Sequence, residues 1–432
     1  RFRRYSRNTC WMFSEQCAAA VSSLLIGVLI ARHLGPEHYG IYAFAIALVM
    51  LMSPIAKLGL DIVLVQRLIS VSVEVQACLL STAFWMKTAA GLLLFAITVA
   101  IAVLAPESHS TTAIEIAAVL LLWQGFEVIS LYYQARVEAH VMAPRVIFQL
   151  LLSAGLKLWL IQVDAGVSTF LWALIADRAI LAGLLYQNLR PSSVRFLCVI
   201  PNFENARELW AASWPLIFSG LAVVGYARID QVMIGSLLNA SEVGVYSVGI
   251  RITEVWLILP SVCAASFFPA LVNAKADNED RFRFRMALLY SSFMGIGGLV
   301  ALCTLLFAEP LVIYIFGEPF RAAAGIAQIR IFETLFAALG ILSSRWLHVH
   351  HQQRWAVVFT SSGLLCNVIL NAFFIRIYGI PGAAVASVLS IIMTVLLVPS
   401  LLPATRPNVR LMLGAPWVVG RHLYTRIVNG TL

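Results

Sequence analysis

Six basic residues lie inside the long apolar runs of this chain: Lys87, Lys157, Arg178, Arg228, Arg251 and Arg330. A basic side chain at mid-bilayer costs about 2.5–3.5 kcal/mol on insertion scales, so such residues usually face a bundle interior or a wet cavity. Basic residues in such a place mark the path of an anion. The pattern predicts a membrane transporter with a cationic lumen. Its candidate substrate-binding residues are Lys87, Arg178, Arg228, Arg251 and Arg330.

Arg228 is the strongest of these candidates because no acid can pair with it easily on its own helix. Its near acidic neighbour, Asp230, is two residues away and therefore points to another helix face. We expect Arg228 to contact the substrate, and the alternative is an ion pair with a carboxylate on another span. Arg251 and Glu254 are spaced i,i+3, so a local ion pair is an equal alternative for them.

Two further pairs of charges give weaker predictions. Arg330 and Glu333 repeat the i,i+3 spacing, which favours a local ion pair over a substrate contact. Asp177 and Arg178 are adjacent and diverge by about 100° on a helix, so each is expected to face a different neighbour.

The remaining in-span charges lack a close partner in sequence. Lys87 and Lys157 have no acid within one helical turn, and Glu15 has no basic residue there. Lys157 is expected near the outer interface, where its ammonium would reach water. Glu15, Asp230 and Glu254 are the candidate carboxylates that couple transport to an ion gradient by binding and releasing a proton. The alternative is that they neutralise the arginines without moving.

The composition excludes an ordinary soluble domain. Apolar residues make up 61% of the 432 residues and charged residues only 12%, against about 25% charged in a typical globular protein. The pI of 9.4 does not indicate nucleic-acid binding, because the basic residues are spread between apolar runs rather than gathered in one patch. No nucleic-acid partner is expected.

Metal ions, cofactors and catalytic residues are not expected either. The cysteines form no C-x-x-C pair, and nearly all lie in apolar runs, so we interpret them as small buried hydrophobic residues. His348 and His351 share a helix face, but no cysteine or carboxylate completes a metal site with them. No GxxxxGK sequence occurs, which excludes an ATP-driven motor within this sequence.

Twelve apolar windows have the length of membrane helices. About 20 residues cross the hydrocarbon core, and only helices satisfy their own backbone there at this hydrophobicity. The windows are 10–32, 38–56, 77–104, 112–134, 144–163, 167–189, 209–237, 243–271, 285–307, 321–345, 355–376 and 380–402.

Basic residues between the windows predict the orientation. Outer segments hold only Arg32, Arg321 and Arg376, and nearly all other loop arginines and lysines fall on the opposite side. Because basic loops stay inside, both termini are predicted to be cytoplasmic. Asp61 and Arg67 flank the inner end of the second span, and we interpret them as topological or gating residues.

An internal repeat divides the chain. The segment 30–46 aligns without gaps with 234–250, and the identical pairs are Ile30/Ile234, Leu34/Leu238, Gly40/Gly244, Tyr42/Tyr246 and Ile46/Ile250. Six predicted spans separate the copies, so both halves should share one orientation. The predicted organisation is a six-helix bundle at 1–190, a cytoplasmic linker at 191–208, a second six-helix bundle at 209–402 and a cytoplasmic tail at 403–432.

Four motifs, in order, carry a resemblance to a known family. ARHLGPEHYGIYAFA (31–45) resembles an outer hairpin of Wzx-type polysaccharide-biosynthesis flippases of the MOP superfamily. RIDQVMIG (228–235) with EVGVYSVGIRITE (242–254) is similar to the start of that family's second half. IFGEPFRAA (315–323) and NVILNAFFIRIYGIPGAAVAS (367–387) resemble an outer loop and the last hairpin of the family. The resemblance covers about residues 10–402.

The resemblance implies a fold and a function. The expected fold is all-α, with twelve transmembrane helices in two six-helix pseudo-repeats around a central lumen. The expected function is that of an O-antigen-type flippase, which moves undecaprenyl-pyrophosphate-linked oligosaccharide from the cytoplasmic to the outer leaflet of the bacterial inner membrane. Its expected partners are this lipid-linked oligosaccharide, the bilayer, and polymerase and chain-length proteins of the same pathway.

Two alternatives stay open at this point. A multidrug or ion-coupled exporter of the same superfamily would favour carboxylates and aromatic residues in its lumen, and the excess of in-span basic residues argues against it. A membrane-embedded polysaccharide polymerase or ligase would need a sizeable catalytic outer loop. The outer segments here have the length of mere connections, so a transporter is preferred to an enzyme.

Overall fold

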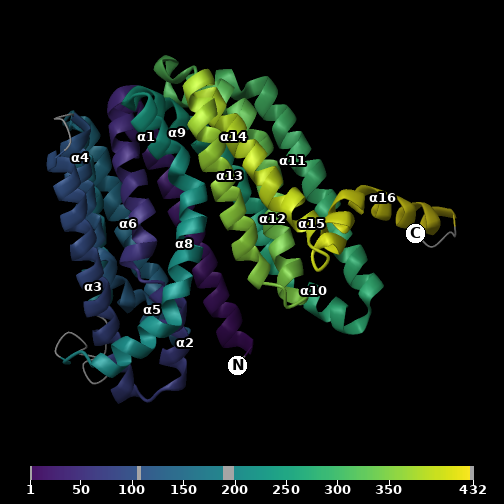
Figure 1. Ribbon diagram of the computed structural model, residues 1–432, viewed down its shortest axis with the longest axis horizontal. Helices are drawn as coiled ribbons and strands as arrows, with labels where there is room; N and C mark the ends of the chain where they lie inside the picture. The colour runs from purple at the N-terminus through teal and green to yellow at the C-terminus, as the bar shows by residue number, and fades with distance from the viewer. Residues whose placement is uncertain (1, 105–108, 188–198, 429–432) are drawn as a thin grey trace. The chain divides into compact units, whose positions relative to one another are not determined.

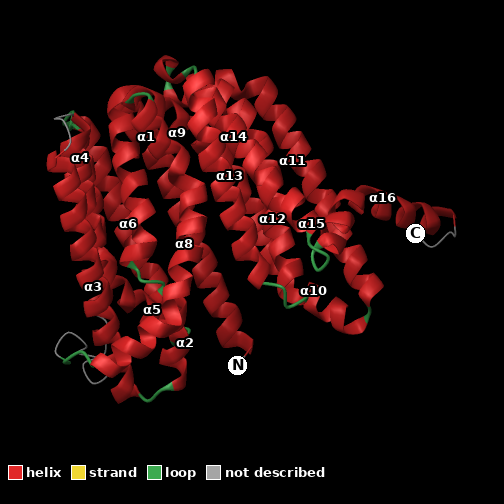
Figure 2. Cartoon of the chain, in the orientation of Figure 1, coloured by secondary structure: helices red, strands yellow, loops and turns green. Residues whose placement is uncertain are grey.

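The computed structural model describes residues 2–104, 109–187 and 199–428, and helices fill most of these ranges (Figures 1 and 2). No strand occurs within them. A helix pairs each backbone N–H with a carbonyl of its own segment, which a strongly apolar chain in lipid requires. The predicted all-α class is confirmed.

The first unit, Arg1–Val232, has a buried core formed mainly by the helices α2, α3 and α5. Leu64, Phe84, Val128 and Tyr133 are among the core residues. The elements of this unit are α1 (Phe2–Ala56), α2 (Leu60–Ser70), α3 (Val73–Leu104), α4 (His109–Ala118), the 3₁₀ segment η1 (Val119–Phe126), α5 (Glu127–Ala135), α6 (Ala139–Gln162), α7 (Val167–Tyr186) and most of α8 (Phe203–Leu237).

The second unit, Met233–Leu432, is organised around α12, which packs against α9, α11 and α14. The last helix, α16, packs against α11 and α15. The elements of this unit are α9 (Ala240–Glu254), η3 (Val255–Leu257), α10 (Ile258–Asp277), α11 (Glu279–Phe316), η4 (Glu318–Phe320), α12 (Ala323–Val349), α13 (Arg354–Tyr378), α14 (Ile380–Ile392), the π-helical turn η5 (Met393–Leu397), α15 (Val398–Leu401) and α16 (Arg406–Val428).

Helix α1 is broken at Gly35, where the backbone leaves the helical conformation with φ 70° and ψ 174°. Only glycine adopts this region without strain, and Pro36 follows it directly. The break falls between the predicted spans 10–32 and 38–56. The aligned position of the repeat, Asn239, also interrupts a helix, because it is the extended N-cap of α9. The two copies of the repeat therefore place a helix break at the same position.

Eleven helices in the described ranges are long and apolar enough to cross a membrane. The first, Cys10–Ala56, has 47 residues, enough for two crossings of about 20 residues each, and contains the Gly35 break. Each of the other candidates overlaps one predicted window. A multi-pass membrane protein is thus established, and the count of twelve stays a prediction.

The predicted domain boundaries also stay predictions. Of the expected linker 191–208, residues 191–198 lie outside the described residues, and the division between the two units falls later, within α8. The expected tail 403–432 contains α16.

The cysteines differ from their prediction in one respect. The six described cysteines are free, as expected, but none of them is buried in the chain, and Cys10 and Cys303 are exposed. The prediction of burial was wrong because the apolar surroundings of a spanning helix include lipid as well as protein. Cys198 lies outside the described residues.

Candidate functional site

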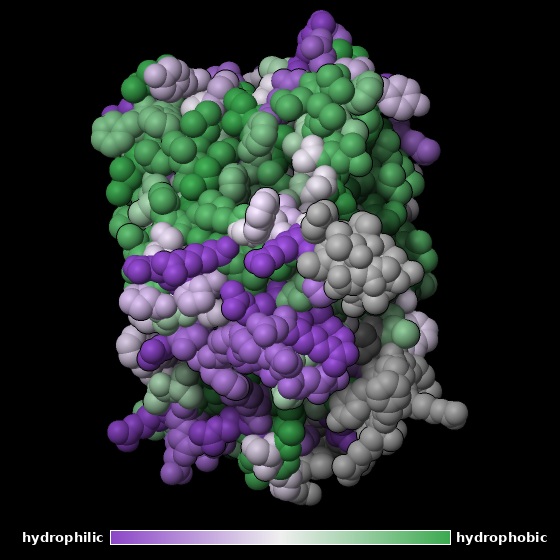
Figure 3. Space-filling view, turned by 90° about the vertical axis from the view of Figure 1, so that its right-hand side faces the viewer, coloured by the Kyte–Doolittle hydropathy of each residue, from purple (hydrophilic) through white to green (hydrophobic). Residues whose placement is uncertain are grey.

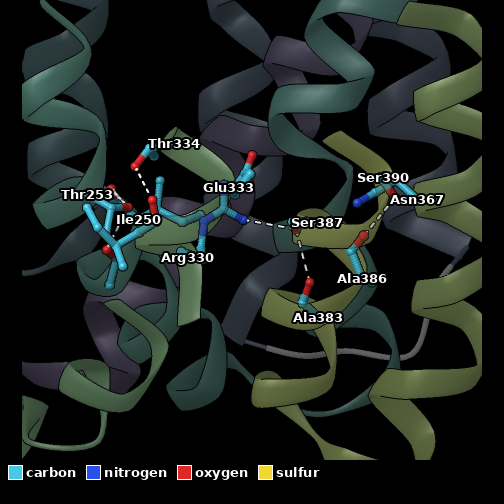
Figure 4. Close-up of polar contacts among 12 residues, drawn as sticks. Ile250, Thr253, Arg330, Glu333, Thr334, Asn367, Ala383, Ala386, Ser387 and Ser390 are labelled. Carbon is cyan, nitrogen blue, oxygen red and sulfur yellow. Dashed lines mark hydrogen bonds and ion pairs between the residues drawn. The ribbon is translucent and has the colours of Figure 1, made fainter. Parts of the chain in front are cut away.

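In the second unit, Arg330 holds three helices together (Figure 4). Its guanidinium, on α12, lies 2.5 Å from Glu333 Oε2 of the same helix. It also donates to the Tyr246 hydroxyl of α9 at 2.7 Å and to Ser387 Oγ of α14 at 3.1 Å. The Tyr246 ring lies beneath the guanidinium carbon, with 5.4 Å between that carbon and the ring centroid. Arg330 is therefore a buried junction between α9, α12 and α14.

The local ion pair expected from the i,i+3 spacing of Arg330 and Glu333 is confirmed. Sequence reasoning missed the other members of the junction. Tyr246 was visible only as an identical position of the repeat, and Ser387 only as the end of a family-like segment. A hydroxyl gives no sequence signal of its own, so the spatial contact was needed to find both. A role of Arg330 in substrate binding stays a prediction.

Polar residues of α13 also face the interior of the second unit. Asn367 and Asn371 are fully buried, and the Asn371 amide donates to Asn367 Oδ1 at 2.9 Å. The close-up shows Asn367 beside Ser390 of α14, whose hydroxyl donates to the Ala386 carbonyl at 2.7 Å. The segment 367–387 had pointed to this helix only through the family resemblance.

In the first unit, four charged residues from α2, α3, α5 and the end of α1 form an alternating chain. Lys87 is fully buried, and its ammonium lies 2.5 Å from Asp61 Oδ1. Lys57 lies 2.9 Å from Glu127 Oε2 and 3.8 Å from Asp61 Oδ2. Asp61, expected to be a topological or gating residue, therefore neutralises Lys87. We call Lys57, Asp61, Lys87 and Glu127 the charged chain of the first unit.

Arg178 of α7 adds an uncompensated positive charge near this chain. Burial disfavours the charged form of Lys57, but the Glu127 and Asp61 carboxylates outweigh it and raise the Lys57 pKa. The positive charge of Arg178 lowers the Lys57 pKa, so Arg178 is close enough to Lys57 to repel its ammonium. Arg178 is exposed, and in the described ranges no carboxylate lies within ion-pair distance of it. The charged chain together with Arg178 therefore carries one excess positive charge.

The prediction for Lys157 was wrong. Its side chain does not reach water, because Lys157 is only 7% exposed and its ammonium lies 2.6 Å from Asp177 Oδ2 of α7. The ammonium also donates to Ser153 Oγ at 2.7 Å, and that hydroxyl donates to Asp177 Oδ2 at 2.9 Å. A carboxylate on the neighbouring helix offers a nearer partner than the interface does. The expected divergence of Asp177 and Arg178 is confirmed, since Asp177 faces α6 and Arg178 is exposed.

Arg228, the strongest sequence candidate, lies half-buried on α8. Asp230 is buried at 3% exposure, and no ion pair joins it to Arg228, as the two-residue spacing predicted. Among the residues that the structure describes, no carboxylate lies within ion-pair distance of Arg228. Arg228 and Arg178 are thus the two candidates of the first unit whose charge is not locally neutralised.

The other candidates give a mixed outcome. The described residues contain no ion pair between Arg251 and Glu254, so the local pair that was an equal alternative for them is not found, although Arg251 is not without a partner. Glu15 and Glu254 are both half-buried. The predicted cavity lined by Arg228 and Arg251 would involve both units, and it stays a prediction. No group of three or more histidine, cysteine, aspartate or glutamate residues in the described ranges could hold a metal ion.

Comparison with known proteins decides the family. Residues 29–324 match the model of a family described as polysaccharide biosynthesis proteins. The chain belongs to this family. The resemblance inferred from the four sequence motifs is therefore confirmed.

Two relatives from the archaeon Haloferax volcanii extend the comparison. One, the probable low-salt glycan biosynthesis flippase Agl15, is 28% identical over 199 residues, which cover 44% of this chain and 40% of the relative. The other, the probable flippase AglR, is 25% identical over 270 residues, which cover 59% of this chain and 53% of the relative. The chain thus matches about half the length of these relatives or less.

Solved structures show the same fold. The inward-facing form of a multidrug resistance MATE transporter of the MOP superfamily has a TM-score of 0.68 at 14% identity, over 95% of this chain and 96% of that one. The lipid II flippase MurJ, in an inward closed conformation, has a TM-score of 0.64 at 14% identity, over 97% and 92%. A MOP transporter from Pyrococcus furiosus has a TM-score of 0.60 at 14% identity, over 97% and 95%. This chain therefore has the MOP fold. Because one fold can serve several transport functions, the substrate has to be argued from the residues of the site and not from the fold.

Proposed function

We propose that this protein is a flippase that carries a polyprenyl-pyrophosphate-linked oligosaccharide from the cytoplasmic to the outer leaflet by alternating access. In a bacterium the carrier would be undecaprenyl pyrophosphate and the membrane the inner membrane, with both termini cytoplasmic. Membership of the polysaccharide biosynthesis family and the two relatives named as flippases support this proposal. The protein acts as a transporter and catalyses no covalent step.

The observation that carries the proposal is the division of five of the six in-span basic residues into two groups. Lys87, Lys157 and Arg330 each have a carboxylate within 2.6 Å. Arg178 and Arg228 have none within ion-pair distance in the described part of the chain. An apolar chain keeps such arginines at a cost unless an anion binds them. A pyrophosphate supplies the oxygens that two guanidiniums would bind in bidentate fashion.

The energetics fit outward movement of a lipid-linked anion. The oligosaccharide passes through a wet interior while the prenyl chain stays in the hydrocarbon. An inside-negative potential favours export of a doubly charged anion by about 4–5 kcal/mol at 100 mV. The main barrier is therefore removal of water from the pyrophosphate, which the arginines offset. Polymerase and chain-length proteins of the same pathway would use the exported product.

A cation exporter is the second candidate, because a multidrug MATE transporter shares the fold. Such an exporter would need carboxylates free to bind the cargo. Asp61, Asp177 and Glu333 are each engaged by a lysine or an arginine instead. These three carboxylates are therefore not free to bind a cation, which favours an anionic cargo.

Complementation tests the proposal. The gene is expressed in a strain that lacks its lipid-linked oligosaccharide flippase, and both the surface polysaccharide and the accumulated intermediate are measured. We expect the intermediate to disappear and the surface polysaccharide to return. Resistance to cationic drugs without either effect would instead support the exporter and reject the flippase.

A further inference from the structure

A cavity of about 530 Å³ lies in the second unit, where the end of α10 and the start of α11 meet the end of α12 and the start of α16. Its charged lining residues are Lys275, Glu279, Arg283 and Arg410, and Trp346 and His350 form part of its wall. The cavity is separate from the Arg330 junction and uses none of the candidate substrate residues.

The cavity is positively charged. Lys275 pairs with Glu279, and its ammonium lies 3.2 Å from His350 Nε2. Burial lowers the His350 pKa below its usual value, so His350 is neutral at pH 7. Arg283 and Arg410 are exposed, and no described carboxylate lies within ion-pair distance of either one. Two guanidiniums, one from α11 and one from α16, therefore remain available to an anion.

Apolar residues accompany these charges, since Trp346, Leu411 and Val418 also line the cavity. The Trp346 ring stacks on His350 with 3.9 Å between centroids. On α16, Met412 packs inward, whereas Leu413 and Trp417 are 60% and 78% exposed. An exposed tryptophan such as Trp417 is typical of the membrane–water interface, where the ring lies at headgroup level. Helix α16 thus has the pattern of an interfacial helix.

The position of the cavity agrees with this pattern. Helix α11 has 38 residues, more than the roughly 20 needed to cross the hydrocarbon, and the predicted span 285–307 leaves its first turns outside it. Figure 3 shows the side on which α16 lies, with hydrophobic surface above and hydrophilic residues gathered below. The basic residues around 275–285 predict that this end of α11 is cytoplasmic, and the cytoplasmic leaflet is the one that carries anionic lipids.

We propose that this cavity binds the phosphate headgroup of an anionic phospholipid from the cytoplasmic leaflet. Arg283 and Arg410 bind the phosphate oxygens, because guanidiniums form charge-assisted bonds with phosphate. Trp346 and Val418, apolar residues of the cavity lining, lie against the glycerol and upper acyl region. The bound lipid links α16 to α11 and α12. This site is independent of the cargo of the flippase.

The test uses the purified full chain in neutral detergent, with bound lipid counted by native mass spectrometry during titration with phosphatidylglycerol. The variant is Arg283→Gln with Arg410→Gln. The matched control is Arg281→Gln with Arg354→Gln, which removes the same charge from exposed arginines outside the cavity. We expect about fivefold weaker binding per cavity arginine, or about 25-fold for both, and little change in the control.

Three further probes separate the sources of phosphate. Phosphatidylcholine has the same phosphate but no net charge, and we expect it to bind more weakly than phosphatidylglycerol. Inorganic phosphate lacks the apolar part and is expected to compete only weakly. Equal binding of the two phospholipids, unchanged binding by the double variant, or binding of a polyprenyl pyrophosphate alone would each overturn the proposal.

Discussion

At the residue scale, the in-span basic residues differ by whether a carboxylate forms an ion pair with them. Lys157 is held by Asp177 and Ser153, and Arg330 by Glu333 and two hydroxyl groups. These residues contribute to specific packing. Arg178 and Arg228 have no carboxylate within ion-pair distance in the described ranges and are the residues proposed to bind a cargo, so mutation should distinguish the two classes.

Arg228→Ala should reduce flipping by roughly 10- to 100-fold, because charge-assisted hydrogen bonds contribute about 1.5–3 kcal/mol. Arg228→Lys should recover part of the activity, since an ammonium replaces the bidentate fork by a point charge. Export is measured in the complemented strain, with membrane abundance determined by immunoblot. Arg376→Ala, at an exposed position on α13, is the control. Full export by Arg228→Ala at normal abundance would show that Arg228 does not contact the substrate.

Lys157→Met should lower the stability of the protein by about 3 kcal/mol, because it leaves the Asp177 carboxylate buried without its cation. Lys157→Met combined with Asp177→Leu should recover most of this loss, since an apolar pair of similar volume needs no neutralisation. The midpoint of thermal unfolding in detergent measures both effects. A double variant no more stable than the single one would contradict the role of this pair as a mutually neutralised unit.

At the element scale, helix breaks and buried polar contacts set how helices meet. The Gly35 break divides α1, and Asn239 caps α9 at the aligned position of the repeat. The Arg330 junction then connects α9 to α12 and α14. Gly35 lies in the first copy of the repeat, and Asn239 and Tyr246 lie in the second. The backbone geometry of both copies is therefore expected to be sensitive to substitution.

Gly35→Ala should destabilise the protein by about 1–3 kcal/mol, because φ 70° and ψ 174° lie in a region reserved almost entirely for glycine. The added methyl group meets no atom within 4 Å, so the cost is one of backbone conformation alone. Gly155→Ala, in the helical interior of α6 and equally free of neighbours, is the matched control and should be neutral or stabilising. Similar thermal midpoints for the two variants would exclude strain at Gly35.

At the scale of the whole molecule, transport by two units requires a source of energy, and the sequence contains no GxxxxGK nucleotide-binding motif. Cycling would draw on the substrate gradient, the membrane potential or an ion. Asp230 lies two residues from Arg228, Glu254 lies three residues from Arg251, and Glu15 lies in the first predicted span. Binding of a proton by one of them would change the charge balance between the two facing states.

Flipping in proteoliposomes should therefore respond to an imposed pH or sodium gradient. Asp230→Asn, Glu254→Gln and Glu15→Gln each remove the titrating carboxylate, and at least one of them should abolish the response while basal flipping continues. The rate of flipping is followed with a fluorescent lipid-linked oligosaccharide. A wild-type rate that is indifferent to both gradients would leave these acids as static neutralising groups.

The sequence by itself determined the helices, the positions of most spans and the family. These follow from local properties: long apolar windows and ordered motifs. The tertiary structure decided which charges meet. Lys87 pairs with Asp61 and Lys157 with Asp177, and both partners lie at least 20 residues away on another helix. Spacing within one helix predicted the Arg330–Glu333 pair correctly, but it could not predict these pairs, because each depends on how neighbouring helices pack.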